Sequence, residues 1–88
     1  MKPNAIKVSD KDNVAVVIKS IAKGEEIRLK EGDRLMAQED IPFGHKVALR
    51  PIAQGSDIVR YGEVILRASK DISSGSWVHL HNTVSFVD

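Results

Sequence analysis

The sequence contains no cysteine, few aromatic residues and no long hydrophobic run. Without cysteine neither a disulfide framework nor a thiolate metal site can form, so we expect a reducing, cytoplasmic setting. No apolar segment has the length that a secretion signal or a transmembrane helix requires, and we predict neither. The four aromatic residues, Phe43, Tyr61, Trp77 and Phe86, form no array suited to stacking bases.

Neither sign of charge dominates the chain. The 13 Lys and Arg residues are interspersed with 12 Asp and Glu residues, giving a net charge of +1. Nucleic-acid modules usually concentrate positive charge on one face, so we predict no nucleic-acid partner and no membrane partner. The chain is short enough for one domain, residues 1–88, with about 60–65% of its unfolded surface buried. Because such a domain has little spare stability, a partner would help it.

What the sequence does contain is a seven-residue repeat that occurs four times. Each copy has an isoleucine, a glycine three residues later and a β-branched residue three further on; the copies span 21–27, 41–47, 52–58 and 72–78. Their first residues are spaced 20, 11 and 20 apart, which groups the copies into two pairs. Since glycine readily adopts the positive φ of a tight turn, each copy is predicted to be a strand–turn–strand unit.

The pattern of apolar residues predicts an all-β fold. Apolar residues alternate or form short β-branched stretches, which indicates a small, irregular barrel or sandwich of about nine strands. The predicted strands are 5–8, 14–18, 26–29, 34–37, 46–50, 57–60, 64–68, 77–81 and 83–87. Segment 14–18 is apolar on both faces and is predicted to be central, 9–13 is predicted to be a turn, and a short helical turn is expected within 69–73.

The sharpest local signal for chemistry is the pair His79 and His81, followed by Asn82. In a strand, alternate residues share a face and lie about 7 Å apart. Two imidazoles at this spacing can ligate one metal ion or contact one anionic substrate. The alternative is a pair of surface histidines on a partly wetted strand.

A second candidate site is the turn that carries His45 and Lys46 directly after Gly44. It presents either an acid–base and carboxylate-binding pair or two solvated residues on a loop. Arg50, on the same predicted strand face as Lys46, either adds to a carboxylate clamp or is simply solvated.

Other polar and aromatic residues have structural interpretations. Asp40 and Asp71 each precede a repeat isoleucine and are predicted to cap turns through their carboxylates. Trp77 is expected to cover the core or to form part of an interface, and 61–63 is predicted to be a turn in which Glu63 is a weak candidate for chemistry. No complete catalytic constellation can be assembled, so an enzyme containing this chain would take only part of its site from it.

Taken together, these motifs resemble the SAF-type domain of the altronate/galactarate dehydratase family. The resemblance spans almost the whole chain. Its most specific elements, in order, are the Gly-His-Lys, Tyr-Gly-Glu and His-x-His-Asn motifs at 44–46, 61–63 and 79–82. One departure is Leu66, where the family usually has glycine.

The resemblance implies a β-clip fold and a role in a sugar-acid dehydratase. Such enzymes remove water from an aldonic or aldaric acid to give a 2-keto-3-deoxy acid and typically depend on a divalent metal, iron or manganese. The small domain precedes a large catalytic domain or forms a separate small subunit. The residues that would then act as catalytic groups, substrate ligands or metal ligands are His45, His79 and His81 (catalytic), Lys46, Arg50 and Asn82 (substrate), and His79 and His81 (metal).

Two other functions stay open. The chain could be a non-catalytic module that docks on the large subunit or forms a homodimer, with its histidines at the interface or on the surface. It is also similar to the small subunit of sulfolactate sulfo-lyase, so the substrate is not fixed by sequence. An ice-binding role would require a flat, weakly charged face, and the dispersed charges oppose it.

Overall fold

The computed structural model describes residues 2–85 and confirms an all-β chain. Every predicted strand is present, although most are shorter than expected. The strands are β1 (Ala5–Ile6), β2 (Val14–Val17), β3 (Glu26–Arg28), β4 (Arg34–Met36), β5 (Lys46–Ala48), β6 (Asp57–Arg60), β7 (Glu63–Ala68), β8 (Trp77–Val78) and β9 (Thr83–Val84). Residues 86 and 87 of the last predicted strand lie outside the described residues. Within 2–85 no helix is long and apolar enough to cross a membrane.

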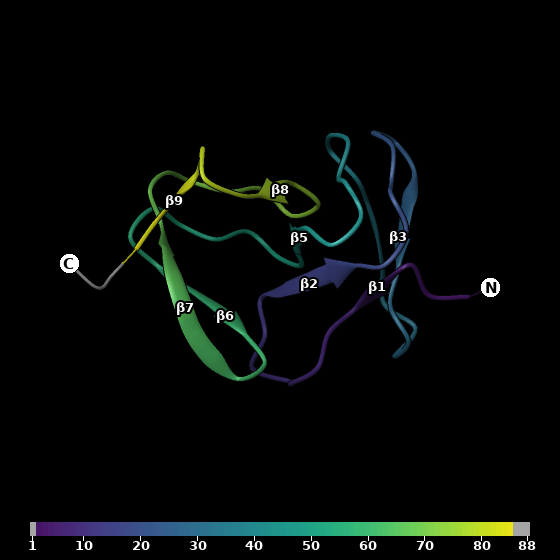
Figure 1. Cartoon of the computed structure of the whole chain (residues 1–88), viewed down its shortest axis with the longest axis horizontal. Coiled ribbons are helices and arrows are strands. Elements are labelled where there is room, and N and C mark those ends of the chain that lie inside the picture. The colour runs from purple at the N-terminus through teal and green to yellow at the C-terminus, as the bar shows by residue number, and fades with distance from the viewer. Residues whose placement is uncertain (1, 86–88) are drawn as a thin grey trace.

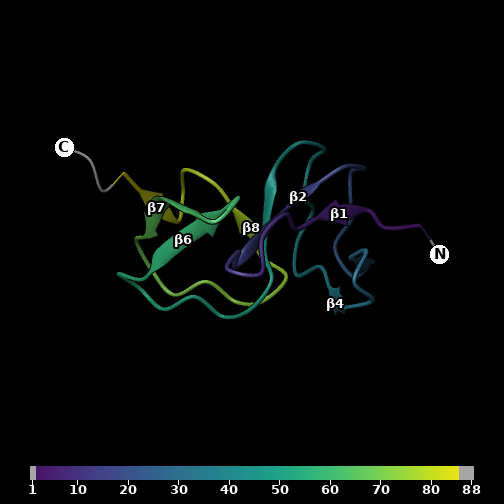
Figure 2. The same cartoon turned by 90° about the horizontal axis from the view of Figure 1, so that it is seen from below.

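The strands form three small antiparallel sheets. The central sheet has the order β1-β2-β5-β8, a hairpin pairs β3 with β4, and the third sheet has the order β6-β7-β9. The molecule is elongated, 41 × 24 × 19 Å, with the β3–β4 hairpin at one end and β6, β7 and β9 at the other (Figures 1 and 2). The central sheet therefore joins two ends that are built separately.

Two sequence-predicted features around the fourth repeat are wrong. The expected helical turn in 69–73 is absent, because Ile72 instead bridges to Ile52 in antiparallel fashion. The strand predicted to run from 77 to 81 ends at Val78, and 79–82 is a turn. Strand β5 likewise ends at Ala48 rather than at residue 50.

Each glycine repeat folds into the same tight turn. The four repeat glycines have φ between 84° and 87°, and the next residue donates a backbone hydrogen bond of 2.9–3.1 Å to the carbonyl three positions earlier. This is the geometry of a type II turn, in which the third residue needs a positive φ. The repeats pair as their spacing indicates, because Ile21 bridges to Ile41 just as Ile52 bridges to Ile72.

The predicted turn-capping role of Asp40 and Asp71 is confirmed, with one difference. Asp40 Oδ1 accepts a 2.8 Å hydrogen bond from the backbone N–H of Lys23. Asp71 Oδ1 accepts an equivalent 2.8 Å bond from Gln54. Each carboxylate therefore caps the turn of the other repeat in its pair and holds the two turns together.

Each pair of repeats builds one of two cores, and the central sheet separates them. Strand β2 sends Val14 to one side and Ala15 and Val17 to the other, which confirms the prediction of a central strand buried on both faces. The first core contains Ala5, Ala15, Val17, Ile21, Ile27, Leu29, Ala37, Ile41 and Val47. The second contains Val14, Ala48, Ile52, Ile58, Ala68, Ile72 and Val78.

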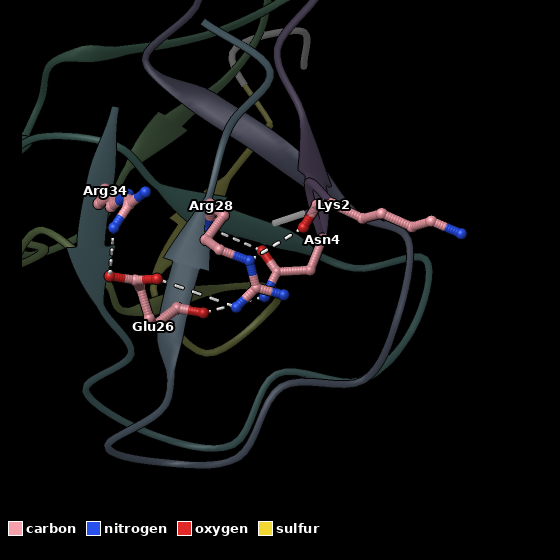
Figure 3. Close-up of polar contacts among 5 residues, drawn as sticks. All are labelled: Lys2, Asn4, Glu26, Arg28 and Arg34. Carbon is pink, nitrogen blue, oxygen red and sulfur yellow. Dashed lines mark hydrogen bonds and ion pairs between the residues drawn. The ribbon is translucent and has the colours of Figure 1, made fainter. Parts of the chain in front are cut away.

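After three of the four repeat turns, a buried asparagine forms hydrogen bonds to the backbone of the strand that follows the turn. Asn4 donates from Nδ2 to the carbonyl of Glu26 at 2.9 Å and accepts at Oδ1 from the N–H of Arg28 at 2.7 Å (Figure 3). The same side of the hairpin carries an ion pair of 3.8 Å between Arg34 and Glu26. The amide of Asn4 therefore bonds to backbone groups of β3 as a neighbouring strand would.

Asn13 and Asn82 make the same pair of bonds on later repeats. Asn13 bridges the carbonyl of Asp57 and the N–H of Val59, each at 2.8 Å. Asn82 bridges the carbonyl of Trp77 at 2.8 Å and the N–H of His79 at 2.9 Å. Because Asn82 bonds back to a residue only five positions earlier, it bends the chain after β8, which explains why the predicted strand stops there.

Candidate functional site

The histidine of the second repeat and the one that directly follows the fourth repeat meet across the central sheet. Strands β5 and β8 pair in the register Lys46↔Val78 and Val47↔Trp77. Continuing this register by one residue places His45 opposite His79, and their ring centroids are 4.8 Å apart. The second and fourth repeats thus bring their histidines together because their strands are neighbours.

Trp77 lies at the centre of a group that we call the Trp77 cluster: Trp77, His45, His79 and His81. The indole ring stacks on His79 with centroids 5.1 Å apart and an interplanar angle of 8°. The rings of His45 and His81 are tilted against it at 5.5 Å and 5.3 Å. All three histidines of the chain therefore contact one side chain.

A hydrogen bond fixes the protonation of His45. Trp77 Nε1 donates to His45 Nδ1 at 3.1 Å. Indole nitrogen can only donate, so Nδ1 must be unprotonated and neutral His45 carries its proton on Nε2. The cluster therefore presents a His45 Nε2–H donor of defined orientation.

Trp77 is itself held by the first half of the chain. Its backbone N–H donates to Glu39 Oε2 at 3.0 Å, and the carbonyl of Gly75 accepts from the N–H of Gln38 at 2.9 Å. The side chain also packs, half-buried, against the first core. The segment after β4 consequently positions the residue around which the histidines gather.

Desolvation, and after it neighbouring positive charges, lowers two pKa values at or beside the cluster. Partial burial, followed by the charges of His45, Lys46 and His81, lowers the pKa of His79 below 6.5. Desolvation, and then the charge of Arg60, lowers the pKa of Lys46 below 10.5. Because its pKa is lowered from 6.5, His79 is mainly neutral at pH 7 and is able to accept a proton.

These residues do not by themselves fit a divalent metal ion. Among residues 2–85, no three His, Asp or Glu side chains converge closely enough to hold a metal. His45 Nδ1 already accepts a hydrogen bond from Trp77. The positive charges near His79 would repel a metal cation. The metal-binding role of His79 and His81 stays a prediction that needs ligands from outside this chain.

The other two sequence-predicted site residues lie apart from the cluster or inside the fold. Asn82 is 4% exposed, and both ends of its amide are bonded to the backbone. Arg50 is exposed beyond the end of β5 and lines a hollow of about 360 Å³ to which none of the histidines contributes. Contact of Asn82 or Arg50 with substrate stays a prediction that nothing in the site geometry supports.

Sequence reasoning missed the role of Trp77 as the organiser of the site. Strand alternation suggested that His79 and His81 act as a pair, but they belong to a turn and meet through Trp77. The arrangement depends on the register of β5 against β8, which places residue 45 across from 79. The repeat marks the residues on these two strands but does not specify that register.

Comparison with known proteins now identifies the family. The family model described as altronate/galactarate dehydratase SAF domain matches residues 3–86. The chain belongs to this family. The SAF chain is 42% identical to altronate dehydratase of Bacillus subtilis (strain 168) over 78 residues, and 45% identical to galactarate dehydratase (L-threo-forming) of Escherichia coli (strain K12) over 73 residues.

The fraction of the relative's own length that aligns with this chain differs between the dehydratases and the sulfo-lyase subunit. The alignments take in 89% and 83% of this chain, but only 16% and 14% of the two dehydratases. By contrast, the (2R)-sulfolactate sulfo-lyase subunit alpha of Chromohalobacter salexigens is 30% identical over 82 residues, which span 85% of this chain and 87% of that subunit. The SAF chain therefore corresponds to a small part of the dehydratases and to nearly all of a small subunit.

The stacking of Trp77 on His79 predicts a pH-dependent fluorescence signal. Trp77 is the single tryptophan of the chain, and protonating the imidazole stacked on it will quench its emission. Because the pKa of His79 is lowered, we expect the quenching midpoint below pH 6.5. Titrating emission against pH checks this. His79→Gln is expected to reduce the amplitude of the transition rather than remove it, because His45 and His81 also contact the indole; an unchanged curve for His79→Gln would refute the stacking.

Proposed function

We propose that this chain is the N-terminal domain or small subunit of a cytoplasmic, metal-dependent sugar-acid dehydratase. Altronate is the first expected substrate. The cross-strand pairing of His45 and His79 around Trp77 is the observation that carries the proposal. The names of the dehydratase relatives support the reaction class. The site would be completed by a larger catalytic domain or subunit.

The proposed chemistry is elimination of water from the sugar acid. This needs a base that removes the proton next to the carboxylate and an acid that protonates the leaving hydroxyl. His79, kept neutral by its lowered pKa, is assigned as the base. His81, the exposed member of the cluster, is assigned as the proton donor, and His45 orients the substrate through its Nε2–H. Lys46 faces a carboxylate; a metal would be bound by residues of the catalytic domain.

A chimera tests this function. The matching 78-residue region of the B. subtilis altronate dehydratase is replaced by this chain, and altronate dehydration is assayed. We expect turnover to be retained, and kcat to fall by about 100-fold or more in the His45→Gln and His79→Gln chimeras. Lys23→Gln, at the exposed turn of the first repeat, is the matched control and should change nothing. Folded histidine variants with undiminished turnover would sink the catalytic assignment.

A docking module is the second candidate, favoured by exposed apolar residues beside the cluster. Phe43 is 68% exposed and Leu80 is 81% exposed, and they lie within two residues of His45 and between His79 and His81. Exposed apolar side chains of this size mark interaction sites when they lie together. If Phe43→Ser or Leu80→Ser prevents assembly of the chimera, or of a homodimer, while the histidine variants retain kcat, docking is the function. Replacing subunit alpha of the Chromohalobacter salexigens sulfo-lyase by this chain, with sulfolactate as the substrate, tests the sulfo-lyase alternative.

A further inference from the structure

The hairpin turn between β6 and β7 holds a tyrosine in a conformation that tyrosine rarely adopts. Arg60 pairs with Glu63, which leaves a two-residue turn formed by Tyr61 and Gly62. Their φ values are 57° and 77°, so both lie in the left-handed region. This turn matches the twist of a β-hairpin, but it usually places asparagine or aspartate first. Tyr61 therefore carries a conformational cost that its side chain has to offset.

The ring of Tyr61 supports the guanidinium of Arg60. The guanidinium carbon lies 5.1 Å from the ring centroid, within the range of a cation–π contact. Arg60 Nε is buried and has no hydrogen-bond partner within the part of the chain that the structure describes. Buried donors are nearly always satisfied, so an unsatisfied guanidinium nitrogen indicates a missing acceptor.

A second cation lies in the same part of the fold. Strand β5 carries the partly buried Lys46, whose pKa is lowered first by desolvation and then by the charge of Arg60. The two strands are linked through β2, since Val16 pairs with Lys46 and β2 packs against β6. Among residues 2–85, no carboxylate forms an ion pair with Lys46 or Arg60. Two neighbouring positive charges that are partly desolvated repel each other, and a bound anion would offset this repulsion.

We propose that Arg60 and Lys46 together form a binding site for the carboxylate of a small acid. The planar guanidinium offers two parallel donors to a carboxylate, and Lys46 adds a point charge. Arg60 would be a substrate-binding residue in place of the sequence-predicted Arg50. Lys46 connects this site with the Trp77 cluster, because its charge also contributes to the lowered pKa of His79. Only the choice of a sugar acid as the ligand rests on the proposed function.

Nuclear magnetic resonance of the isolated chain tests this site without any catalysis. The Arg60 Nε–Hε signal of the wild type, and the backbone amide signals of β6 and β7 in the wild type and every variant, are followed while galactarate is added at constant ionic strength, with galactitol as the uncharged control. We expect a saturable shift with galactarate alone. The apparent Kd should rise about tenfold in Arg60→Gln, which corresponds to loss of a charge-assisted hydrogen bond. Arg34→Gln, which removes an exposed arginine at the opposite end of the molecule, is the matched control and should bind normally.

Arg60→Lys protects the test against a folding defect, because it keeps the charge and removes only the planar fork. It should fold and bind weakly. The absence of a saturable shift in the wild type would overturn the proposal, as would equal saturation by sulfate or normal binding by Arg60→Gln. Failure of the histidine variants to alter turnover in the chimera would refute the catalytic role while leaving this binding result intact, so the two proposals fail separately.

Discussion

Replacing Gly75 with alanine is expected to lower the free energy of unfolding by about 4 kcal/mol, whereas Gly55→Ala costs only about 1–2 kcal/mol. Both glycines occupy the same turn position, with φ of 85° and 84°. The left-handed conformation therefore penalises alanine equally at the two sites. At Gly75 an added Cβ would also collide with the carbonyl oxygen of Met36, whereas at Gly55 it would meet nothing.

Urea denaturation of the two variants measures the difference. Small domains are stable by roughly 5–15 kcal/mol, so Gly75→Ala removes a large part of the total. The collision has a cause in the fold, because the Gly75 carbonyl accepts a 2.9 Å hydrogen bond from Gln38 and so draws the two backbones together. Equal losses in Gly55→Ala and Gly75→Ala would show that the segment after β4 does not press on the fourth turn. That result would also contradict the conclusion that the segment after β4 positions Trp77.

The repeat predicted the fold well because its residues act locally. A glycine with positive φ defines each turn, and the β-branched residues on either side enter a core wherever the turn lies. The spacing even indicated the pairing of the copies, which the Ile21–Ile41 and Ile52–Ile72 bridges confirm. Strand positions followed for the same reason, since alternation needs no knowledge of distant partners.

The exact strand ends could not be predicted, because they depend on side chains that bond to distant backbone. Asn13 fastens β6 from 44 residues away along the chain. Nothing in the sequence around residue 57 indicates this partner. Asn82 ends β8 by bonding back to Trp77, although its motif had suggested contact with substrate.

The candidate site was only half predictable for a related reason. His45 and Lys46 were found as unusual residues within the second repeat, and His79 and His81 as residues directly after the fourth. Their arrangement required the β5–β8 register, which places His45 against His79 rather than His79 beside His81 on a strand face. Arg60 had no motif to mark it, and its importance depends on the buried Nε and on the ring of Tyr61.

Replacing Asp12 with alanine is the second substitution with a large expected effect, about 3 kcal/mol of the free energy of unfolding. Asp12 is 2% exposed. Its Oδ2 accepts from the N–H groups of Val8 and Ser9 at 3.2 and 3.1 Å, and its Oδ1 accepts from Gly62 at 2.8 Å. The carboxylate thus ties the first turn of the chain to the Tyr61–Gly62 hairpin, fifty residues later. Loss of Asp12 should therefore also loosen Arg60.

The contribution of the Asp12 carboxylate to the free energy of unfolding depends on pH. Burial alone raises the pKa of the carboxyl, but the N–H groups of Gly62, Ser9, Tyr61 and Val8 outweigh burial and hold the pKa below 3.8. A depressed carboxyl pKa stabilises the fold above the unfolded value, and the contribution is lost as the pH falls through the folded value. The wild type should therefore exceed Asp12→Asn in stability at pH 7, and the gap should narrow as the pH falls below about 3.8.

Urea unfolding of wild type and Asp12→Asn at pH 7 and pH 3 measures this gap, with the exposed Asp10→Asn as the matched control from the same turn. Asp12→Asn removes the charge and replaces one acceptor oxygen by a donor NH2 group, so the hydrogen bonds to that oxygen are lost as well. Asp12→Ala loses all three hydrogen bonds. A gap that stays constant between the two pH values would mean that the Asp12 charge adds nothing. In that case the link between the first turn and the Arg60 hairpin would depend on geometry alone.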